Sequence, residues 1–274
     1  MSEQRSSLEL NEEPARRVRL LVAYDGSAFS GFAKNLDVVT VAGELERHIA
    51  KVARHPVTIT GAGRTDKGVH AWGQVVTFDT WSDRIEPQRL ARSINSVLGP
   101  QIAVRDASLV PLDFDARFSA TWRRYRYTIL RSAAPNPFLA NTAWHLDEPL
   151  DLDAMRAASE RFLGSHDFSS FCRRPPAAPG RPERSLERTV TELVWRELPD
   201  EVLQMQITAK AFCHQMVRSI TGTIVDVGRG RFSPEDIDAV FAARDRNAGG
   251  RLAPPHGLCL HEVGYESTST FATR

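Results

Sequence analysis

The stretch GAGRTDKGVHAWGQVVTF, Gly61–Phe78, joins a charged, glycine-rich loop to a hydrophobic strand. The alternation of VTIT at 57–60 predicts one strand and Gln74–Phe78 predicts the next. Residues 61–73 lie between them and fit neither a helical nor a strand period. Loops of that length inside compact domains are uncommon and are often functional. The stretch is therefore either a solvated turn or an active site.

On both sides of this loop, the periodicity predicts a mixture of strands and helices. Strands are expected at 18–24, 57–60, 74–78, 122–130, 202–212 and 258–265, and helices at 40–54, 86–98, 151–163, 214–228 and from Ser233 onward. In residues 202–212, apolar and polar side chains alternate, which is typical of an antiparallel sheet with one face in water. The sequence therefore predicts an α+β fold with a mainly antiparallel sheet.

The chain is long enough for two α+β halves, predicted at 18–112 and 113–265. Terminal tails are expected at 1–17 and 266–274, and the Pro- and Arg-rich stretch 173–188 is expected to form a long surface loop.

The composition is that of an ordinary globular protein. Of 274 residues, 42% are hydrophobic and 25% charged, and the net charge is only +1. No run reaches the roughly 18 apolar residues of a membrane span, and the polar first residues lack the apolar core of a secretory signal. Cys172, Cys213 and Cys259 are far apart and show no metal-ligand spacing. Free thiols in a reducing cytosol are therefore expected.

Asp66 is the residue of the loop that could carry chemistry. An Asx-type turn is the structural alternative. Glycoside hydrolysis would need a second carboxylate, which only a distant part of the chain could supply. A metal site would need clustered ligands, and His70 alone is more typical of a structural histidine. Phosphate-cradling motifs are absent. A single nucleophilic carboxylate acting without a metal or cofactor remains open.

Basic residues gather in two further places. Residues 117–131 combine five arginines with interleaved aromatic residues and no acid. This pattern fits either single-stranded or flipped-out nucleic acid or an edge strand made soluble by arginine. In residues 212–228, the helical period turns Arg218 away from the apolar stripe, so that it faces either solvent or a cleft.

Several motifs together resemble the tRNA pseudouridine synthase A family. Its core pattern G-R-T-D-x-G-V-H-A followed by G-Q-V is matched by the opening stretch. The other matching blocks occur in order at 23–32, 117–127, 166–171, 212–228 and 253–265. The resemblance spans residues 18–265, nearly the whole chain.

The resemblance implies an isomerase that converts uridine to pseudouridine in the anticodon stem-loop, at positions 38–40 of the tRNA. It implies two ferredoxin-like halves around a central basic cleft, the pseudouridine synthase fold, in a cytoplasmic homodimer whose partner is tRNA and not DNA. Asp66 would be the nucleophile, Tyr125 would lie beside the target base, Arg64 would help to displace that base, and Arg218 would pair with Asp66. No cofactor or metal is implied, because the isomerisation is redox-neutral.

Two departures from the family pattern stand out. Phe32-Ala33 replaces the usual Trp-Gln, which affects local packing or an RNA contact and not the chemistry, and Lys67 replaces a common Ala. Three alternatives remain open. They are a pseudouridine synthase acting on other RNA positions, a non-catalytic tRNA-binding protein, and a nucleoside or glycoside hydrolase.

Overall fold

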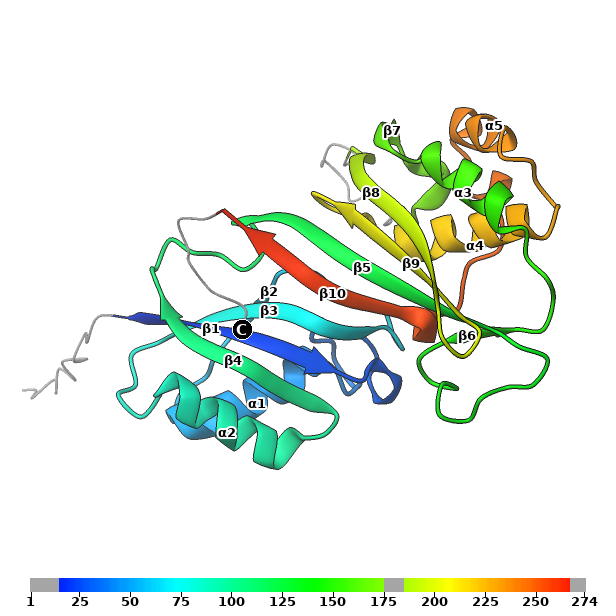
Figure 1. The fold of residues 1–274 in the computed structure, drawn as a ribbon. Helices are drawn as coiled ribbons and strands as arrows, with labels where there is room; N and C mark the ends of the chain where they lie inside the picture. The colour runs from blue at the N-terminus through cyan, green and yellow to red at the C-terminus, as the bar shows by residue number, and fades with distance from the viewer. Residues whose placement is uncertain (1–14, 175–184, 267–274) are drawn as a thin grey trace, which may run out of the picture.

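The computed structural model describes residues 15–174 and 185–266, and these form one mixed sheet with helices packed on it (Figure 1). The strands are β1 Arg16–Tyr24, β2 Thr60–Gly61, β3 His70–Thr80, β4 Ile102–Val110, β5 Ala120–Arg131, β6 Trp144–Leu146, β7 Gly164–Asp167, β8 Glu187–Leu198, β9 Val202–Ala209 and β10 Leu258–Tyr265. Their order in the sheet is β4-β1-β3-β10-β5-β9-β8-β7, with β2 beside β3 and β6 beside β5. The predicted α+β class is confirmed.

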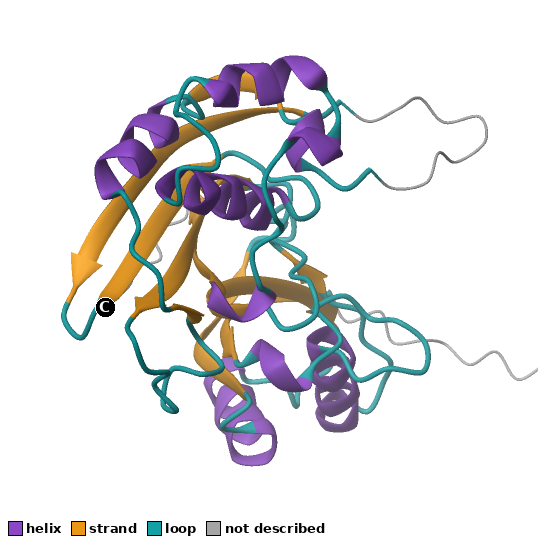
Figure 2. Ribbon diagram, turned by 90° about the vertical axis from the view of Figure 1, so that its right-hand side faces the viewer, coloured by secondary structure: helices purple, strands orange, loops and turns teal. Residues whose placement is uncertain are grey.

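The helices lie at opposite ends of the molecule (Figure 2). They are α1 Val41–Ala53, α2 Pro87–Leu98, α3 Leu152–Glu160, α4 Met216–Gly228 and α5 Asp236–Ala243. The helices α1 and α2 lie with the N-terminal strands, whereas α3, α4 and α5 lie with the C-terminal strands. Local sequence explains two of the helix starts. Thr40 accepts a hydrogen bond from Gly43 N–H, and Asp151 accepts from the N–H groups of Asp153 and Ala154.

The last strand, β10, joins the two ends of the sheet. It pairs in parallel with β3, where Cys259 lies opposite His70, and antiparallel with β5, where Leu260 lies opposite Tyr125. One buried apolar cluster extends from Leu20 on β1 to Ile224 on α4. The C-terminal strand therefore brings β3, which follows the charged loop, next to β5. The boundaries 18–112 and 113–265 stay predictions.

Several element boundaries differ from the sequence expectations. The strand predicted at 57–60 is reduced to Thr60–Gly61, and β3 begins at His70, so the charged loop is shorter than predicted. β1 begins at Arg16, inside the predicted tail. The predicted tails otherwise fall at 1–14 and 267–274, outside the described residues, as does the 175–184 part of the predicted loop.

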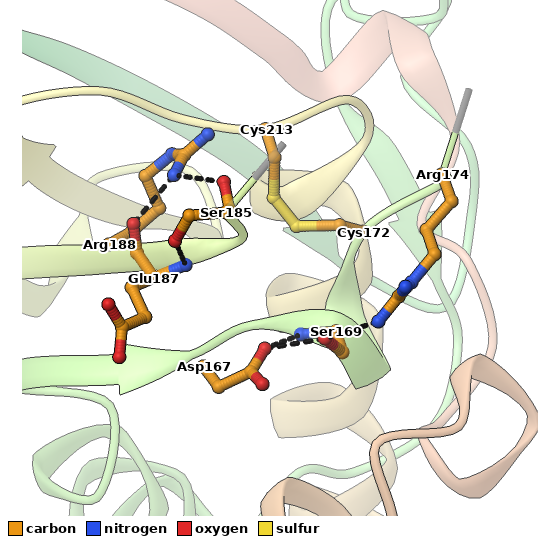
Figure 3. The surroundings of a disulfide bond; sticks show 8 residues. All are labelled: Asp167, Ser169, Cys172, Arg174, Ser185, Glu187, Arg188 and Cys213. Atoms are coloured by element: carbon orange, nitrogen blue, oxygen red, sulfur yellow. Dashed lines mark hydrogen bonds between the residues drawn. A yellow bond between two sulfur atoms is a disulfide. The ribbon is translucent and has the colours of Figure 1, made fainter. Parts of the chain in front are cut away.

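The expectation of free thiols is wrong for two of the three cysteines. Cys172 and Cys213 form a disulfide, with their Cα atoms 5.8 Å apart (Figure 3). The fold brings the segment after β7 against the segment after β9, a proximity that the 41-residue separation in sequence conceals. Cys259 is a free thiol whose pKa is raised to about 11 by burial. None of the helices in the described residues is long and apolar enough to cross a membrane.

Candidate active site

The loop between β2 and β3 is held in place by side chains buried beneath it. Gly63 N–H donates to Gln74 Oε1 at 3.2 Å, and Gln74 Nε2 donates to the Gly63 carbonyl at 2.6 Å. Thr65 and Tyr24 share a hydroxyl–hydroxyl hydrogen bond of 2.7 Å. Because Gln74 is fully buried, these bonds are shielded from water and fix the loop that carries Asp66 ahead of β3.

At two positions in and beside the loop, the local structure requires a glycine. Gly68 has a φ of +78°, a conformation that other residues rarely adopt. At Gly61, a side chain would collide with the ring of Phe32, which is buried beneath the loop and stacks on Tyr24 at 6.2 Å. Phe32, one of the two departures from the family pattern, thus packs beneath the loop.

The carboxylate of Asp66 lies between two basic side chains from the other end of the chain. Arg218 Nη1 is 3.4 Å from Asp66 Oδ2, and His214 Nε2 is 3.2 Å from Asp66 Oδ1. Arg218 lies in the first turn of α4, and its Nε donates to the Ala253 carbonyl at 2.8 Å. Its side chain is only 11% exposed, so Arg218 points toward Asp66 and not into solvent. The structure therefore brings together Asp66 and Arg218, which are 152 residues apart in sequence.

Tyr125 forms a wall of the same site. It is buried on β5, and the ring of Phe212 contacts it edge-on at 5.1 Å. Burial is the main cause of the raised pKa of Tyr125, and the negative charge of Asp66 adds to it. The phenol is therefore protonated at neutral pH. Its hydroxyl makes no hydrogen bond within the described part of the chain.

The remaining charged residues of the loop differ in their roles. Arg64 and Lys67 are exposed, and neither forms an ion pair within residues 15–174 and 185–266. His70 is buried: its Nδ1 accepts from Gly26 N–H at 3.1 Å, and its Nε2 faces the His256 carbonyl at 3.1 Å. His70 is thus structural, as its pattern suggested, and it links the loop to the residues before β10.

Neither interpretation of the arginine-rich strand describes it fully. β5 lies between β10 and β9, so the edge-strand alternative is wrong. Arg123 is buried and donates to the carbonyls of Ala62 and Lys210, so it supports the Asp66 loop from below and cannot contact a phosphate. Arg124 pairs with Glu262 at 2.7 Å on the other face of the sheet.

Two basic residues near Asp66 escaped the sequence reasoning. His214 stands four residues before Arg218, and this spacing was the available signal. Arg246 belongs to a short turn after α5 and donates to the side chain of Gln215. Burial and then the positive charges of Arg173 and Arg218 lower the pKa of Arg246, whereas the charge of Asp66 opposes this. Arg246 is therefore electrostatically coupled to the Asp66 site.

Gln215, which precedes α4, holds a left-handed backbone conformation with a φ of 66°. Such a conformation is uncommon for a residue other than glycine and is found repeatedly at functional sites. Within the described residues, no group of three or more His, Cys, Asp or Glu side chains could hold a metal ion.

Comparison with known proteins shows which family the sequence matches. The sequence model described as "tRNA pseudouridine synthase" matches residues 20–119 and 158–266. A protein of Bacillus velezensis named tRNA pseudouridine synthase A is 41% identical over 92% of this chain and all of its own length. A protein of the same name from Leifsonia xyli is 39% identical over 92% of this chain and 93% of its own.

Among solved structures, a chain in the crystal structure of the archaeal box H/ACA sRNP Nop10-Cbf5 complex aligns with a TM-score of 0.37 and 12% identity. The alignment covers 77% of this chain and 44% of that one. The match of the family over most of the sequence, together with the identity to full-length relatives, decides the assignment: the chain belongs to the tRNA pseudouridine synthase family.

Proposed function

We propose that this protein isomerises uridine to pseudouridine in the anticodon stem-loop of tRNA. The observation that carries the proposal is the Asp66 carboxylate held between Arg218 and His214, with Tyr125 as a neighbouring wall. Its relatives carry the name of tRNA pseudouridine synthase A, which supports tRNA as the substrate. Choice of the anticodon arm follows from the family resemblance of the loop and its companion blocks.

Asp66 is proposed as the nucleophile. In the overall reaction the C1′–N1 glycosidic bond of uridine breaks, a C1′–C5 bond forms, C5 loses a proton and N1 gains one. A carboxylate can hold the sugar or the base covalently between these steps. The positive charge of Arg218, 3.4 Å away, stabilises the ionised carboxylate before attack.

Tyr125 and Arg64 are proposed to handle the base. The protonated phenol of Tyr125 lies beside the loop that carries Asp66, and its hydroxyl can relay a proton by accepting one while it donates its own. The target base must first leave its stack, which costs a few kcal/mol. Arg64 is exposed on the loop that carries Asp66, so its guanidinium can occupy the position that the base leaves.

The assay is tRNA from a strain that lacks the endogenous enzyme, incubated with the protein and scored for pseudouridine at each position. Pseudouridine in the anticodon arm supports the proposal. Pseudouridine elsewhere would favour the alternative of other RNA positions. Released uracil would indicate a hydrolase, and binding without any product would indicate a tRNA-binding protein.

Asp66→Asn tests the nucleophile. The amide keeps the size of the side chain but removes the charge and the nucleophilic oxygen, so turnover should fall to the detection limit. Binding of tRNA should stay within about 3-fold, because phosphate contacts supply most of the affinity for a nucleic acid. Lys67→Gln, a neighbouring exposed change, is the control and should retain turnover. Activity in Asp66→Asn would contradict the assignment.

We further propose a cytoplasmic homodimer. The support is the family resemblance together with large exposed apolar side chains such as Phe138, which is 93% exposed. Light scattering during gel filtration tests it: a dimer should show twice the 30.5 kDa mass of the chain.

A further inference from the structure

A second basic feature lies beside the Asp66 site and has no part in the chemistry proposed above. It is a cavity of about 340 Å³ whose lining includes four arginines, Arg173, Arg174, Arg244 and Arg246. They come from two segments, the end of the β7–η2 region and the turn that follows α5. Cys172 also lines this cavity, and its disulfide with Cys213 ties the first segment to the residues after β9, next to His214.

Charge in the cavity is strongly positive. Asp245 is the acid of the lining, and its Oδ1 accepts from Asn247 N–H at 3.0 Å and from Asn247 Nδ2 at 3.1 Å, so it is occupied by its own turn. Arg244 is 70% exposed and lies 3.3 Å from Asp167. Among the described residues, the lining therefore combines four guanidinium groups with the carboxylate of Asp245, and Arg173 and Arg244 are exposed enough to reach a ligand.

Individual arginines are oriented by the protein while their charge stays accessible. Arg174 Nη2 donates to Ser169 Oγ at 3.0 Å (Figure 3). Arg173 is exposed, and its guanidinium forms no ion pair with any described residue. Its backbone N–H donates to the carbonyl of His214 at 2.9 Å, and the side chain of His214 contacts the Asp66 carboxylate.

The cavity adjoins the Asp66 site, because Arg246 of its lining donates to the side chain of Gln215, the neighbour of His214, which contacts Asp66. The pKa of Arg246 is lowered by burial, by Arg173 in the cavity and by Arg218 at the site. An RNA strand with its target uridine at Asp66 would therefore place neighbouring backbone phosphates near these arginines. Arginine suits this task, because its planar fork binds phosphate oxygens in pairs.

We propose that this cavity binds a backbone phosphate of the RNA on a nucleotide next to the target uridine, with Arg173 and Arg244 as the principal contacts. The inference rests on the proposed function and extends it to a subsite outside the reacting atoms. It assigns these arginines to substrate positioning and leaves the chemistry to Asp66.

The test compares Arg173→Gln, Arg244→Gln and the double variant with Arg92→Gln. Arg92 is a matched control, since it is an exposed arginine on α2 at the other end of the molecule. Each of the two cavity changes should raise KM for an anticodon stem-loop RNA roughly 10-fold with kcat unchanged, the cost of losing a charge-assisted hydrogen bond. The slope of log KM against log salt should become shallower by about 0.7–0.9 in the double variant, because one phosphate is then no longer neutralised.

A phosphate-by-phosphate substitution identifies the linkage that the cavity binds. In stem-loop RNAs that carry one neutral methylphosphonate linkage, the linkage bound by the cavity should raise KM for the wild-type enzyme. The same linkage should have no further effect on the double variant. If the wild-type enzyme makes pseudouridine but the cavity variants match Arg92→Gln in KM and salt slope, the phosphate subsite is refuted. A fall in kcat at constant KM would also overturn it, whereas a wild-type enzyme without product refutes the proposed function itself.

Discussion

Among single residues, Arg218 is the one on which the geometry around Asp66 most depends. It binds the carboxylate through Nη1 and the Ala253 carbonyl through Nε. Arg218→Lys keeps the charge, but one ammonium group cannot reproduce a planar fork that serves two oxygens. The single-turnover rate of pseudouridine formation should fall roughly 10- to 100-fold, with tRNA affinity unchanged within about 3-fold.

The control for this change is Arg92→Lys on the exposed face of α2, which should leave the rate unaltered. A wild-type rate in Arg218→Lys would show that positive charge alone is sufficient. A loss confined to binding would place Arg218 among the RNA contacts and not beside the nucleophile.

The sequence pattern identified Asp66 and Arg218 as candidate site residues but did not reveal the role of Arg123. The loop pattern singled out Asp66, and the helical period turned Arg218 away from the core, but period alone could not separate solvent from cleft. The charge of Arg123 placed it in the arginine-rich pattern that suggested nucleic-acid binding. In the structure Arg123 is buried and donates to the backbone carbonyl of Ala62. Charge in a sequence does not distinguish an arginine that binds a ligand from one that satisfies the protein's own polar groups.

At the scale of elements, the Cys172–Cys213 disulfide joins two segments that border the site. Cys213 lies between Phe212, which contacts Tyr125, and His214, which contacts Asp66. Closing a loop across 41 residues stabilises a fold by about 4 kcal/mol in the chain-entropy description. Reduction should therefore lower the Tm by roughly 10 °C.

Calorimetry with and without a reductant measures this effect. Cys172→Ser should have the lower Tm in both conditions, and Cys259→Ser, which removes the free thiol, should keep the full response to reductant. A wild-type Tm that does not respond to reductant, with thiol titration showing that the bond has been broken, would contradict the stabilising role.

Four strands, β4, β6, β7 and β8, were not predicted. β6 and β7 are only three and four residues long, and bulges explain why the two longer strands, β4 and β8, were missed. The pairing of β1 with β4 shifts register between Leu21 and Val22, so the buried positions of β4 change from Ile102 and Val104 to Ala107 and Val110. The pairing of β8 with β9 shifts in the same way after Val190. A bulge adds one residue and breaks the period of two that identifies a strand.

At the scale of the whole molecule, the position of β10 decides how the site is assembled. It pairs with β3 and with β5, so the Asp66 loop and Tyr125 become neighbours. The sequence predicted a strand at 258–265 but carried no sign that it would enter the middle of the sheet. Strand order depends on long-range pairing, which local periodicity does not encode.

All four tyrosines of the chain lie on strands of this sheet: Tyr24, Tyr125, Tyr127 and Tyr265. Their pKa values predict how the stability of the fold changes at alkaline pH. Burial raises the pKa of each phenol well above the ordinary value of 10. The folded state therefore keeps four protons that the unfolded chain begins to release near pH 10. Their contribution to stability is complete below that pH and is lost as pH rises above it, by up to about 5 kcal/mol per pH unit.

Phenolate absorbance and circular dichroism recorded along one alkaline titration should therefore change together, in a single steep step above pH 10. If phenolate appeared near pH 10 while the circular dichroism stayed native, some tyrosine would be exposed to solvent. Tyr265→Phe provides the internal comparison. It removes one of the four phenols and should make the loss of stability with pH shallower by about a quarter, because each titrating group contributes equally to the slope.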